Sequence, residues 1–272
     1  MNHTITDRKE GDNFMKIGII GGTGFQDLFT NVVEEMVSTE FGDVAIYTGT
    51  CEGKEIVFLP RHGKEHGTLA PFVNYKANMM ALKKAGVERI ISVSAVGAIN
   101  PKIEVGSISV LDNYFDMTKR SNTYGNYSVD MTDPFCPEIQ AAFVEAAKDI
   151  TEPINENINL VCVEGPRYET RLEIQVFGQW GMDVVGMTTS TEAALARELG
   201  MCYAVTTLTT NMAAGVTDTR PSLKVHKEVG ERKNSTMKKL VFQAVHHIHG
   251  QESCTCQEPY QRKMEAAKAK AH

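Results

Sequence analysis

Two segments of this sequence follow apolar runs and carry side chains that bind anions. Residues 60–63 are P-R-H-G, where Arg61 offers a planar fork of donors and His62 adds another. In S-A-V-G, Ser94 supplies a hydroxyl, and small side chains let a ligand approach the backbone of Ala95. A solvated basic loop and close packing of a helix on a sheet are the structural alternatives. The two segments indicate a site for a small anion such as phosphate.

A glycine-rich turn follows the first apolar run. Residues 21–24 are G-G-T-G, and their backbone N–H groups, with the hydroxyl of Thr23, can surround a negative charge. A dinucleotide-binding reductase begins similarly, but its third glycine would fall at Asp27, a poor neighbour for a pyrophosphate. A tight turn that needs glycine dihedrals is the structural alternative.

Another strand-like run ends at an amide. The segment L-T-T-N-M-A-A-G-V places Asn211 directly after apolar and β-branched residues. The structural alternative is an asparagine that tolerates a left-handed turn after a strand. Two more strand ends complete the set, E-G-P-R-Y-E-T at residues 164–170 and G-M-T-T-S-T-E at residues 186–192.

Alternating strands and helices must position these segments. The periodicity of apolar residues predicts strands at residues 16–20, 44–48, 55–59, 89–94, 107–111, 159–163, 183–186 and 202–208. It predicts helices at residues 74–85, 138–149, 172–180, 190–199 and 225–249. This order favours a single α/β domain with a central mixed, largely parallel sheet flanked by helices, and ligands near the strand ends.

Composition limits the possible partners. The chain has 272 residues, 42% hydrophobic and 23% charged, with a net charge of −6. The sequence has no basic stripe with interleaved aromatic residues, so nucleic acid is not an expected partner. A small-molecule substrate is expected instead. No apolar run reaches the roughly 18–20 residues that span a bilayer, so no membrane association is expected. The polar N-terminal residues contain no apolar signal-peptide core, and we therefore expect a cytoplasmic location. We expect a disordered extension at residues 1–14, a catalytic domain at 15–250 and a tail at 251–272.

The cysteines favour a reducing compartment. Four of the six are scattered among apolar neighbours, as buried reduced thiols are, namely Cys51, Cys136, Cys162 and Cys202.

Histidines and thiols gather near the C-terminus. They are His246, His247, His249, Cys254 and Cys256. Such residues could bind zinc or form a local redox pair, but the spacing is not that of a zinc finger. A solvent-exposed helix end followed by exposed tail thiols is the favoured interpretation, and no metal site is predicted.

Six motifs occur together in order: G-G-T-G-F, R-H-G, S-A-V-G, E-G-P-R-Y-E-T, G-M-T-T-x-x-E and T-N-M-A-A-G. In order and spacing, over about residues 16–240, the sequence resembles the trimeric purine nucleoside phosphorylases and the related methylthioadenosine phosphorylases. The resemblance implies a nucleoside phosphorylase fold and a homotrimer. It also implies cleavage of a purine nucleoside by inorganic phosphate, as a co-substrate, to free base and pentose 1-phosphate, with neither metal nor organic cofactor.

The resemblance also assigns roles to individual residues. The family's phosphate-binding positions match Thr23, Arg61, His62, Ser94, Ala95 and Thr188. The nucleoside-binding positions match Tyr168, Glu169, Met187, Asn211 and His226. Met187 falls under the ribose, Tyr168 against the base and His226 on the 5′-hydroxyl. Asn211 falls on the N7 and O6 edge of the purine and Glu169 on N1, and with His62 these form the expected catalytic set.

The same residues favour one branch of the family. The methylthioadenosine branch usually carries Asp at the positions of Asn211 and Ala213, a small hydroxyl residue at Glu169 and a small apolar residue at His226. These departures favour a 6-oxopurine nucleoside phosphorylase that cleaves inosine and guanosine in purine salvage. A phosphorylase for methylthioadenosine or methylthioinosine is the main alternative. An NAD(P)-binding reductase, a hydrolase and a non-catalytic nucleoside-binding protein are more remote.

Subunit contacts follow from the resemblance alone. In the family, a loop from a neighbouring subunit closes part of the sugar site, and the matching segment is residues 127–131. The aromatic or histidine contact of that loop is replaced by Ser128.

Overall fold

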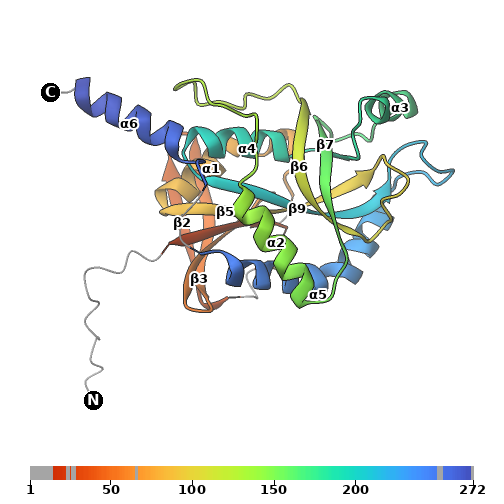
Figure 1. The fold of residues 1–272 in the computed structure, drawn as a ribbon, viewed down its shortest axis with the longest axis horizontal. Coiled ribbons are helices and arrows are strands. Elements are labelled where there is room, and N and C mark those ends of the chain that lie inside the picture. Colours follow the sequence, from red (N-terminus) through yellow and green to blue (C-terminus); the bar gives the residue numbers. More distant parts are fainter. Residues whose placement is uncertain (1–14, 23–24, 26–28, 65–66, 250–253, 271–272) are drawn as a thin grey trace, which may run out of the picture.

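A nine-stranded sheet forms the centre of the protein (Figure 1). The computed structural model describes residues 15–22, 25, 29–64, 67–249 and 254–270. Its strands are β1 (Lys16–Gly21), β2 (Thr30–Thr39), β3 (Gly42–Cys51), β4 (Lys54–Pro60), β5 (Val87–Ala98), β6 (Ile108–Met117), β7 (Ile154–Val163), β8 (Val184–Gly186) and β9 (Cys202–Met212). Thr23, Asp27 and the expected N-terminal extension lie outside the described residues.

The sheet closes on itself at one end. The strand order is β2-β3-β4-β1-β5-β8-β7-β6-β9, and β9 also pairs with β5, so five strands form a ring. Strand β1 runs parallel to β4 and β5, and β5 runs parallel to β9. Strands β3 and β4 are antiparallel, as are β6 and β9. The expected mixed sheet is confirmed.

Helices cover both faces of the sheet (Figure 1). On one face, α1 (Tyr75–Lys84) and α4 (Thr189–Glu198) pack on each other, and α4 also packs on β9. On the other face, α2 (Pro137–Asp149) packs on α5 (Leu223–His247), and both contact β9. Because both faces are covered, β9 is an almost continuous buried run rather than an alternating one.

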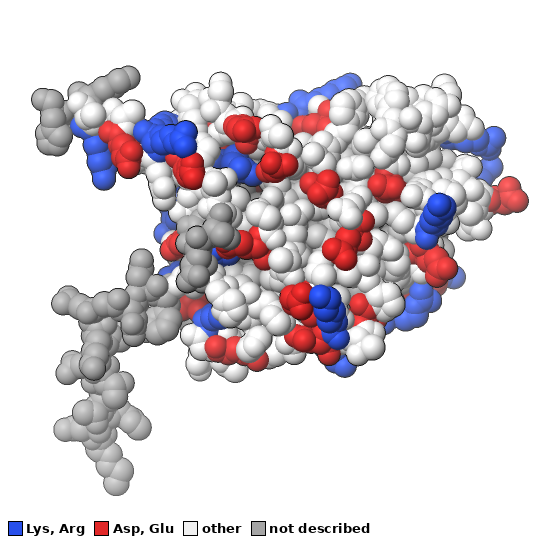
Figure 2. Space-filling view, viewed as in Figure 1, with Lys and Arg blue, Asp and Glu red and all other residues white. Residues whose placement is uncertain are grey.

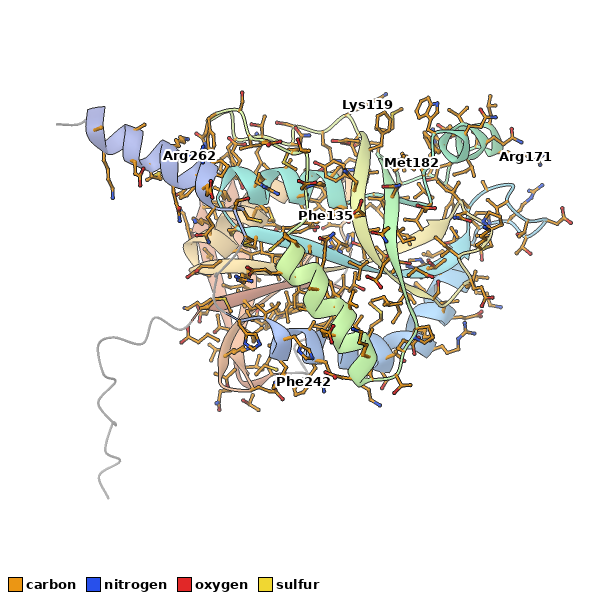
Figure 3. The ribbon with its side chains drawn as sticks, in the orientation of Figure 1. Lys119, Phe135, Arg171, Met182, Phe242 and Arg262 are labelled. Atoms are coloured by element: carbon orange, nitrogen blue, oxygen red, sulfur yellow. The ribbon has the colours of Figure 1, made fainter. Side chains whose placement is uncertain are left out.

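Helices α3 (Arg171–Gln179) and α6 (Glu258–Lys270) lie at opposite ends of the molecule (Figure 1). Helix α3 begins with Arg171, and α6 carries Arg262; both residues are labelled in Figure 3. A short 3-10 helix, η2 (Ala70–Phe72), precedes α1. Every predicted helix and strand is present, with ends shifted by a few residues. The predictions omit β2, because its residues are exposed on both faces and show no apolar alternation.

The surface carries both signs of charge. On the face shown in Figure 2, acidic and basic side chains are interspersed over the described residues. Among those residues, no helix combines the length and the apolar character that crossing a bilayer demands.

Candidate active site

Arg61 is the centre of a buried polar network at the end of β4. The residue follows β4 directly and is only 4% exposed. Its Nε donates to Glu192 Oε1 (2.5 Å), and its Nη2 donates to Glu192 Oε2 (3.1 Å). Nη2 also donates to Ser92 Oγ (2.7 Å), and Nη1 donates to the carbonyl of Val93 (2.9 Å). Within the described residues, four of the five guanidinium N–H groups are engaged, which leaves one Nη1–H.

Glu192 neutralises this guanidinium. It lies in the first turn of α4, is 2% exposed and also accepts hydrogen bonds from Ser92 Oγ (3.1 Å) and the hydroxyl of Tyr203 (2.7 Å). Burial alone would lower the pKa of Arg61, but the Glu192 charge and hydrogen bonds raise it above its ordinary value. Burial also raises the pKa of Tyr203, so its hydroxyl stays a donor. The arginine therefore has a structural partner in addition to any ligand.

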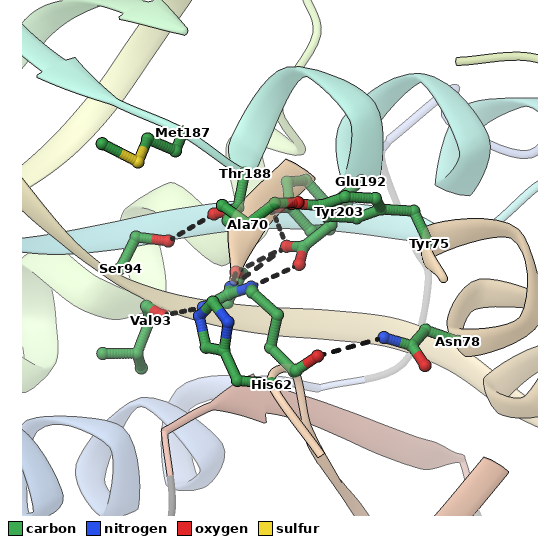
Figure 4. A network of polar contacts seen from close by, with 12 residues as sticks. His62, Ala70, Tyr75, Asn78, Val93, Ser94, Met187, Thr188, Glu192 and Tyr203 are labelled. Carbon is green, nitrogen blue, oxygen red and sulfur yellow. Dashed lines mark hydrogen bonds and ion pairs between the residues drawn. The ribbon is translucent and has the colours of Figure 1, made fainter. Parts of the chain in front are cut away.

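A pair of hydroxyls lies above this network (Figure 4). Ser94 Oγ on β5 is 3.4 Å from Thr188 Oγ1, and both residues are buried. Thr188 is the N-cap of α4, where unpaired backbone N–H groups and the helix dipole favour an anion. Ala95 follows Ser94 and is exposed although it lies within β5. The structure thus brings Ser94, Ala95 and Thr188 together at the N-terminus of α4.

His62 lies beside this site in Figure 4. Its Nδ1 is 2.8 Å from the carbonyl oxygen of Thr68, and a carbonyl can only accept, so Nδ1 carries a proton. Asn78 donates to the carbonyl of Arg61 (3.4 Å), which ties the loop to α1. Thr23, the remaining predicted phosphate residue, lies outside the described residues.

Met187 occupies the same side of Figure 4 as Thr188. Its side chain packs on Gly165, where a Cβ would lie 2.6 Å from Met187 Sδ, and the φ of +70° at this position favours glycine. Its carbonyl accepts from Nη2 of Arg120 (2.5 Å), which also donates through Nη1 to the hydroxyl of Tyr75 (2.6 Å). Arg120 therefore fixes the backbone next to the hydroxyl pair.

Tyr168 and Glu169 precede helix α3. Thr170 caps α3 in a capping box with Glu173, which sets the direction of the preceding residues. Tyr168 is 38% exposed, whereas Glu169 is 9% exposed. Burial raises the pKa of Glu169, and the nearby Glu173 carboxylate adds to this. Arg167 lies two residues away but pairs with Glu173 at 2.7 and 2.9 Å.

Thr210 contacts both Asn211 and His226 at the end of β9. Thr210 Oγ1 donates to Asn211 Oδ1 (3.1 Å) and lies 3.0 Å from His226 Nδ1. Asn211 Nδ2 donates to the carbonyl of Met212 (3.0 Å). A Cβ on Gly97 of β5 would lie 3.0 Å from Asn211 Nδ2, so glycine makes room for the amide. His226 is therefore tied to the Asn211 segment and is not simply a surface residue.

A cavity of about 260 Å³ adjoins Asn211. It is lined by Val105, Asn211, Met212, Thr217, Thr219, Arg220, Pro221 and Val225. The chain after β9 also reaches α3, since Gly215 packs against the side chain of Arg171. A small apolar cluster that includes Ile174 and Ala213 packs α3 in this region. The Glu169 and Asn211 segments are thus held at one end of the molecule.

Four residues of this network were not predicted to have a functional role: Ser92, Arg120, Glu192 and Tyr203. Glu192 closes the G-M-T-T-x-x-E motif, so the motif contained a signal for it. Ser92 lies two residues before Ser94 and therefore on the same face of β5. Arg120 and Tyr203 lie in other parts of the chain, and only the tertiary structure brings them here.

The expectation of exposed tail thiols is wrong. Cys256 is buried and Cys254 is partly buried, because the segment before α6 folds back onto the domain. His246 and His247 do not join them, since they pair with Glu52 (2.7 Å) and Asp149 (2.6 Å). After Cys256 the chain continues into helix α6.

The partly closed mixed sheet flanked by helices, with a candidate anion site at strand ends and at a helix N-terminus, defines an α/β protein of the nucleoside phosphorylase fold. The chain belongs to the Phosphorylase superfamily, which matches residues 16–246. The predicted resemblance is confirmed, and the chain is an enzyme of the pentosyltransferase class.

Proteins that are similar to this chain carry two different enzyme names. One is a probable 6-oxopurine nucleoside phosphorylase of Thermococcus kodakarensis, 42% identical, with 89% of this chain and 96% of the relative covered. Another is an S-methyl-5′-thioadenosine phosphorylase of Pyrococcus horikoshii, 40% identical, with the same coverage. Among solved structures, methylthioadenosine phosphorylase from Schistosoma mansoni in complex with adenine has a TM-score of 0.86 at 27% identity, covering 93% of this chain and 98% of that one.

Proposed function

We propose that the protein cleaves 6-oxopurine nucleosides, such as inosine and guanosine, with inorganic phosphate. The products are the free base and ribose 1-phosphate, and the role is purine salvage. The strongest support is the convergence of Arg61, Ser94 and Thr188 at the N-terminus of α4. Phosphate is then a co-substrate, and the reaction needs neither metal nor organic cofactor.

The phosphate side of the site stabilises the nucleophile. The remaining Nη1–H of Arg61, the hydroxyls of Ser94 and Thr188 and the backbone at Ala95 would donate to phosphate oxygens, with Thr23 and His62 as further donors by motif match. Phosphate held below the sugar attacks the anomeric carbon and stabilises the oxocarbenium-like transition state. Met187 provides the floor for the ribose.

The base side of the site assists the leaving group. As the bond breaks, negative charge gathers on the purine, and the Asn211 amide can donate to N7 while it meets O6. The carboxylate of Glu169 can accept the N1–H of a 6-oxopurine, and Tyr168 packs against the ring. Adenine presents a lone pair at N1, so a charged Glu169 would lose its partner at a cost of about 1–3 kcal/mol or more.

Ala213 supports the same choice of base. It is 1% exposed and belongs to the apolar cluster against α3. A carboxylate there, as in the methylthioadenosine branch, would be buried among apolar side chains. The position therefore fits a site in which Asn211 alone meets the N7 edge.

The second candidate is a phosphorylase for methylthioadenosine or methylthioinosine. It is favoured by relatives of that name at 40% identity, close to the 42% of the probable 6-oxopurine enzyme. His226 argues for a 5′-hydroxyl, because an imidazole facing a methylthio group would leave a polar nitrogen unpaired. Its contact with Thr210 holds the ring near Asn211.

The assembly we propose is a homotrimer. Large apolar side chains are exposed on β6 and α3, including Phe115, Leu172 and Trp180, and such patches mark contact surfaces. We place the enzyme in the cytoplasm without a nucleic-acid or membrane partner, in keeping with the mixed surface charge. A fully active monomer by mass in solution would contradict the trimer.

The reaction is tested by incubating purified protein with inosine in the presence and absence of phosphate. We expect hypoxanthine and ribose 1-phosphate only with phosphate, and competitive inhibition by sulfate. Release of base at the same rate without phosphate would indicate a hydrolase instead. A parallel comparison of inosine with adenosine and methylthioadenosine separates the two candidate substrates.

A further inference from the structure

Four cysteines from three distant parts of the chain meet at one place. Cys136 is the N-cap of α2, Cys202 begins β9, and Cys254 and Cys256 precede α6. Their Sγ atoms all lie within 4.8 Å of one another. Asn211 lies nine residues along β9 from Cys202, a span of roughly 30 Å in an extended strand, so the cluster is remote from the candidate active site.

The spacing of the sulfurs is compatible with a tetrahedral metal site. Zinc binds thiolates at about 2.3 Å, which places the sulfurs of a tetrahedral site about 3.8 Å apart. The Sγ atoms of Cys202 and Cys254 are 3.4 Å apart. All six cysteines lie in the described part of the chain, and none forms a disulfide there, which would need about 2.05 Å.

The surroundings fit a negatively charged metal centre. Arg89 pairs with Cys202 in the register of β5 and β9 and is only 1% exposed. Within the described residues its Nε meets no hydrogen-bond acceptor, although its Nη2 lies 2.5 Å from Glu138 Oε2. Four thiolates around Zn²⁺ carry a net charge of −2, and the buried guanidinium, which also pairs with Glu138, offsets part of that charge.

The same residues fix the backbone of the cluster. Glu138 Oε1 accepts from the backbone N–H of Cys254 (3.0 Å), so the Arg89–Glu138 pair reaches the C-terminal segment. The backbone N–H of Cys136 donates to the carbonyl of Tyr203 (2.8 Å). The ring of Phe135, labelled in Figure 3, lies 6.2 Å from that of Tyr203 and packs beside the cysteines.

We propose that Cys136, Cys202, Cys254 and Cys256 bind one zinc ion. The protein supplies all four ligands and leaves no open position, which defines a structural rather than a catalytic site. Binding converts four thiols to thiolates and releases four protons to solvent. The ion would fasten residues 254–270 to the domain, where Tyr260 packs on Gly200 and Lys263 lies 4.5 Å from the centre of the Tyr127 ring.

The test measures metal in the full-length protein, purified with a thiol reductant and without oxygen. Elemental analysis should find about one zinc per chain, and Co²⁺ substituted for it should give the visible absorption of tetrahedral thiolate cobalt. The double variant Cys254→Ser/Cys256→Ser should lose the zinc, and protease should then remove α6 faster. Cys51→Ser, which changes a buried cysteine outside the cluster, should keep one zinc per chain.

Three results would overturn the zinc site. One is a metal-free protein whose intact mass is lower by about 4 Da, as two disulfides would give. The second is a metal-free protein in which all four thiols react with an alkylating reagent. The third is zinc that persists in Cys254→Ser/Cys256→Ser at the level of the parent. The zinc and cobalt measurements on the unmodified protein decide the question even if a variant folds poorly.

Discussion

Two buried carboxylates, Glu192 and Glu169, differ in what surrounds them. Glu192 accepts hydrogen bonds from Arg61, Ser92 and Tyr203, which are all side chains of the protein itself. Glu169 lies in a loop, where burial raises its pKa, and the nearby cation Arg167 pairs with Glu173 instead. The first carboxylate stabilises the fold around the proposed phosphate site. The second keeps its capacity to accept a hydrogen bond for a ligand.

The largest effect is expected at Arg61. Arg61→Ala should raise the KM for phosphate and also leave Glu192 buried without its cation, at a cost of about 3–5 kcal/mol in the free energy of unfolding. Urea unfolding and phosphate saturation measure the two effects. The control is Glu169→Gln, which should be as stable as the parent or more so, because it removes a charge that burial disfavours.

A double variant sharpens this result. Arg61→Met with Glu192→Gln removes both charges, so it should recover part of the stability that Arg61→Ala loses. If Arg61→Ala is as stable as the parent, then the ion pair does not stabilise the fold and the contrast between the two carboxylates fails.

Glu169 should determine base preference. Glu169→Gln replaces the charged acceptor of the purine N1–H with a neutral one. A hydrogen bond to a charged group is worth about 1.5–3 kcal/mol, so kcat/KM for inosine should fall about 10–150-fold. The loss for adenosine should be small. Glu173→Gln is the matched control, because glutamine can still complete the capping box. Equal losses for inosine and adenosine would show that Glu169 does not contact N1.

The raised pKa of Glu169 predicts a pH dependence. Its carboxyl must be deprotonated to accept N1–H, and a raised pKa means that protonation begins at a higher pH than for an ordinary glutamate, about 4.3. The kcat/KM for inosine should therefore fall as the pH decreases, with a midpoint above that value. Glu169→Gln should lack this acidic limb. Identical pH profiles for the two proteins would assign the limb to another group.

A moderate effect is expected at His226. His226→Val should reduce kcat/KM for inosine relative to 5′-methylthioinosine by about 5–150-fold, because the 5′-hydroxyl is left without a partner in the site, at about 1–3 kcal/mol. Thr210→Val removes the contact that orients the ring and should change the ratio less. A parent enzyme that prefers methylthioinosine would favour the second candidate function.

The smallest effect is expected at two serines on one face of β5, Ser94 and Ser92, which should differ in their effect on phosphate binding and on stability. Ser94→Ala should raise the KM for phosphate about 2–12-fold, the value of one neutral hydrogen bond, without changing stability. Ser92→Ala should instead lower stability, since Ser92 bonds Arg61 and Glu192. If both variants change phosphate binding equally, the phosphate contact and the structural network are not distinct.

Much of the fold was predictable because local patterns specify it. The runs that became β1 and β9 are buried on both faces and appear as continuous apolar segments. The ring of strands was not predictable, since the pairing of β5 with β9 joins residues more than 100 positions apart in sequence, such as Arg89 and Cys202. Strand β2 was missed because its exposed residues carry no periodic signal.

The sequence by itself determined the residues that could bind phosphate and purine, because motifs place particular side chains at strand ends. Only the tertiary structure decided their partners. In the folded protein, Arg61 forms an ion pair with Glu192. His226 is connected to Asn211 through Thr210, and the tail cysteines lie next to Cys136 and Cys202. Burial, charge pairing and the meeting of thiols depend on contacts between distant segments, and such contacts form only when the chain packs around its core.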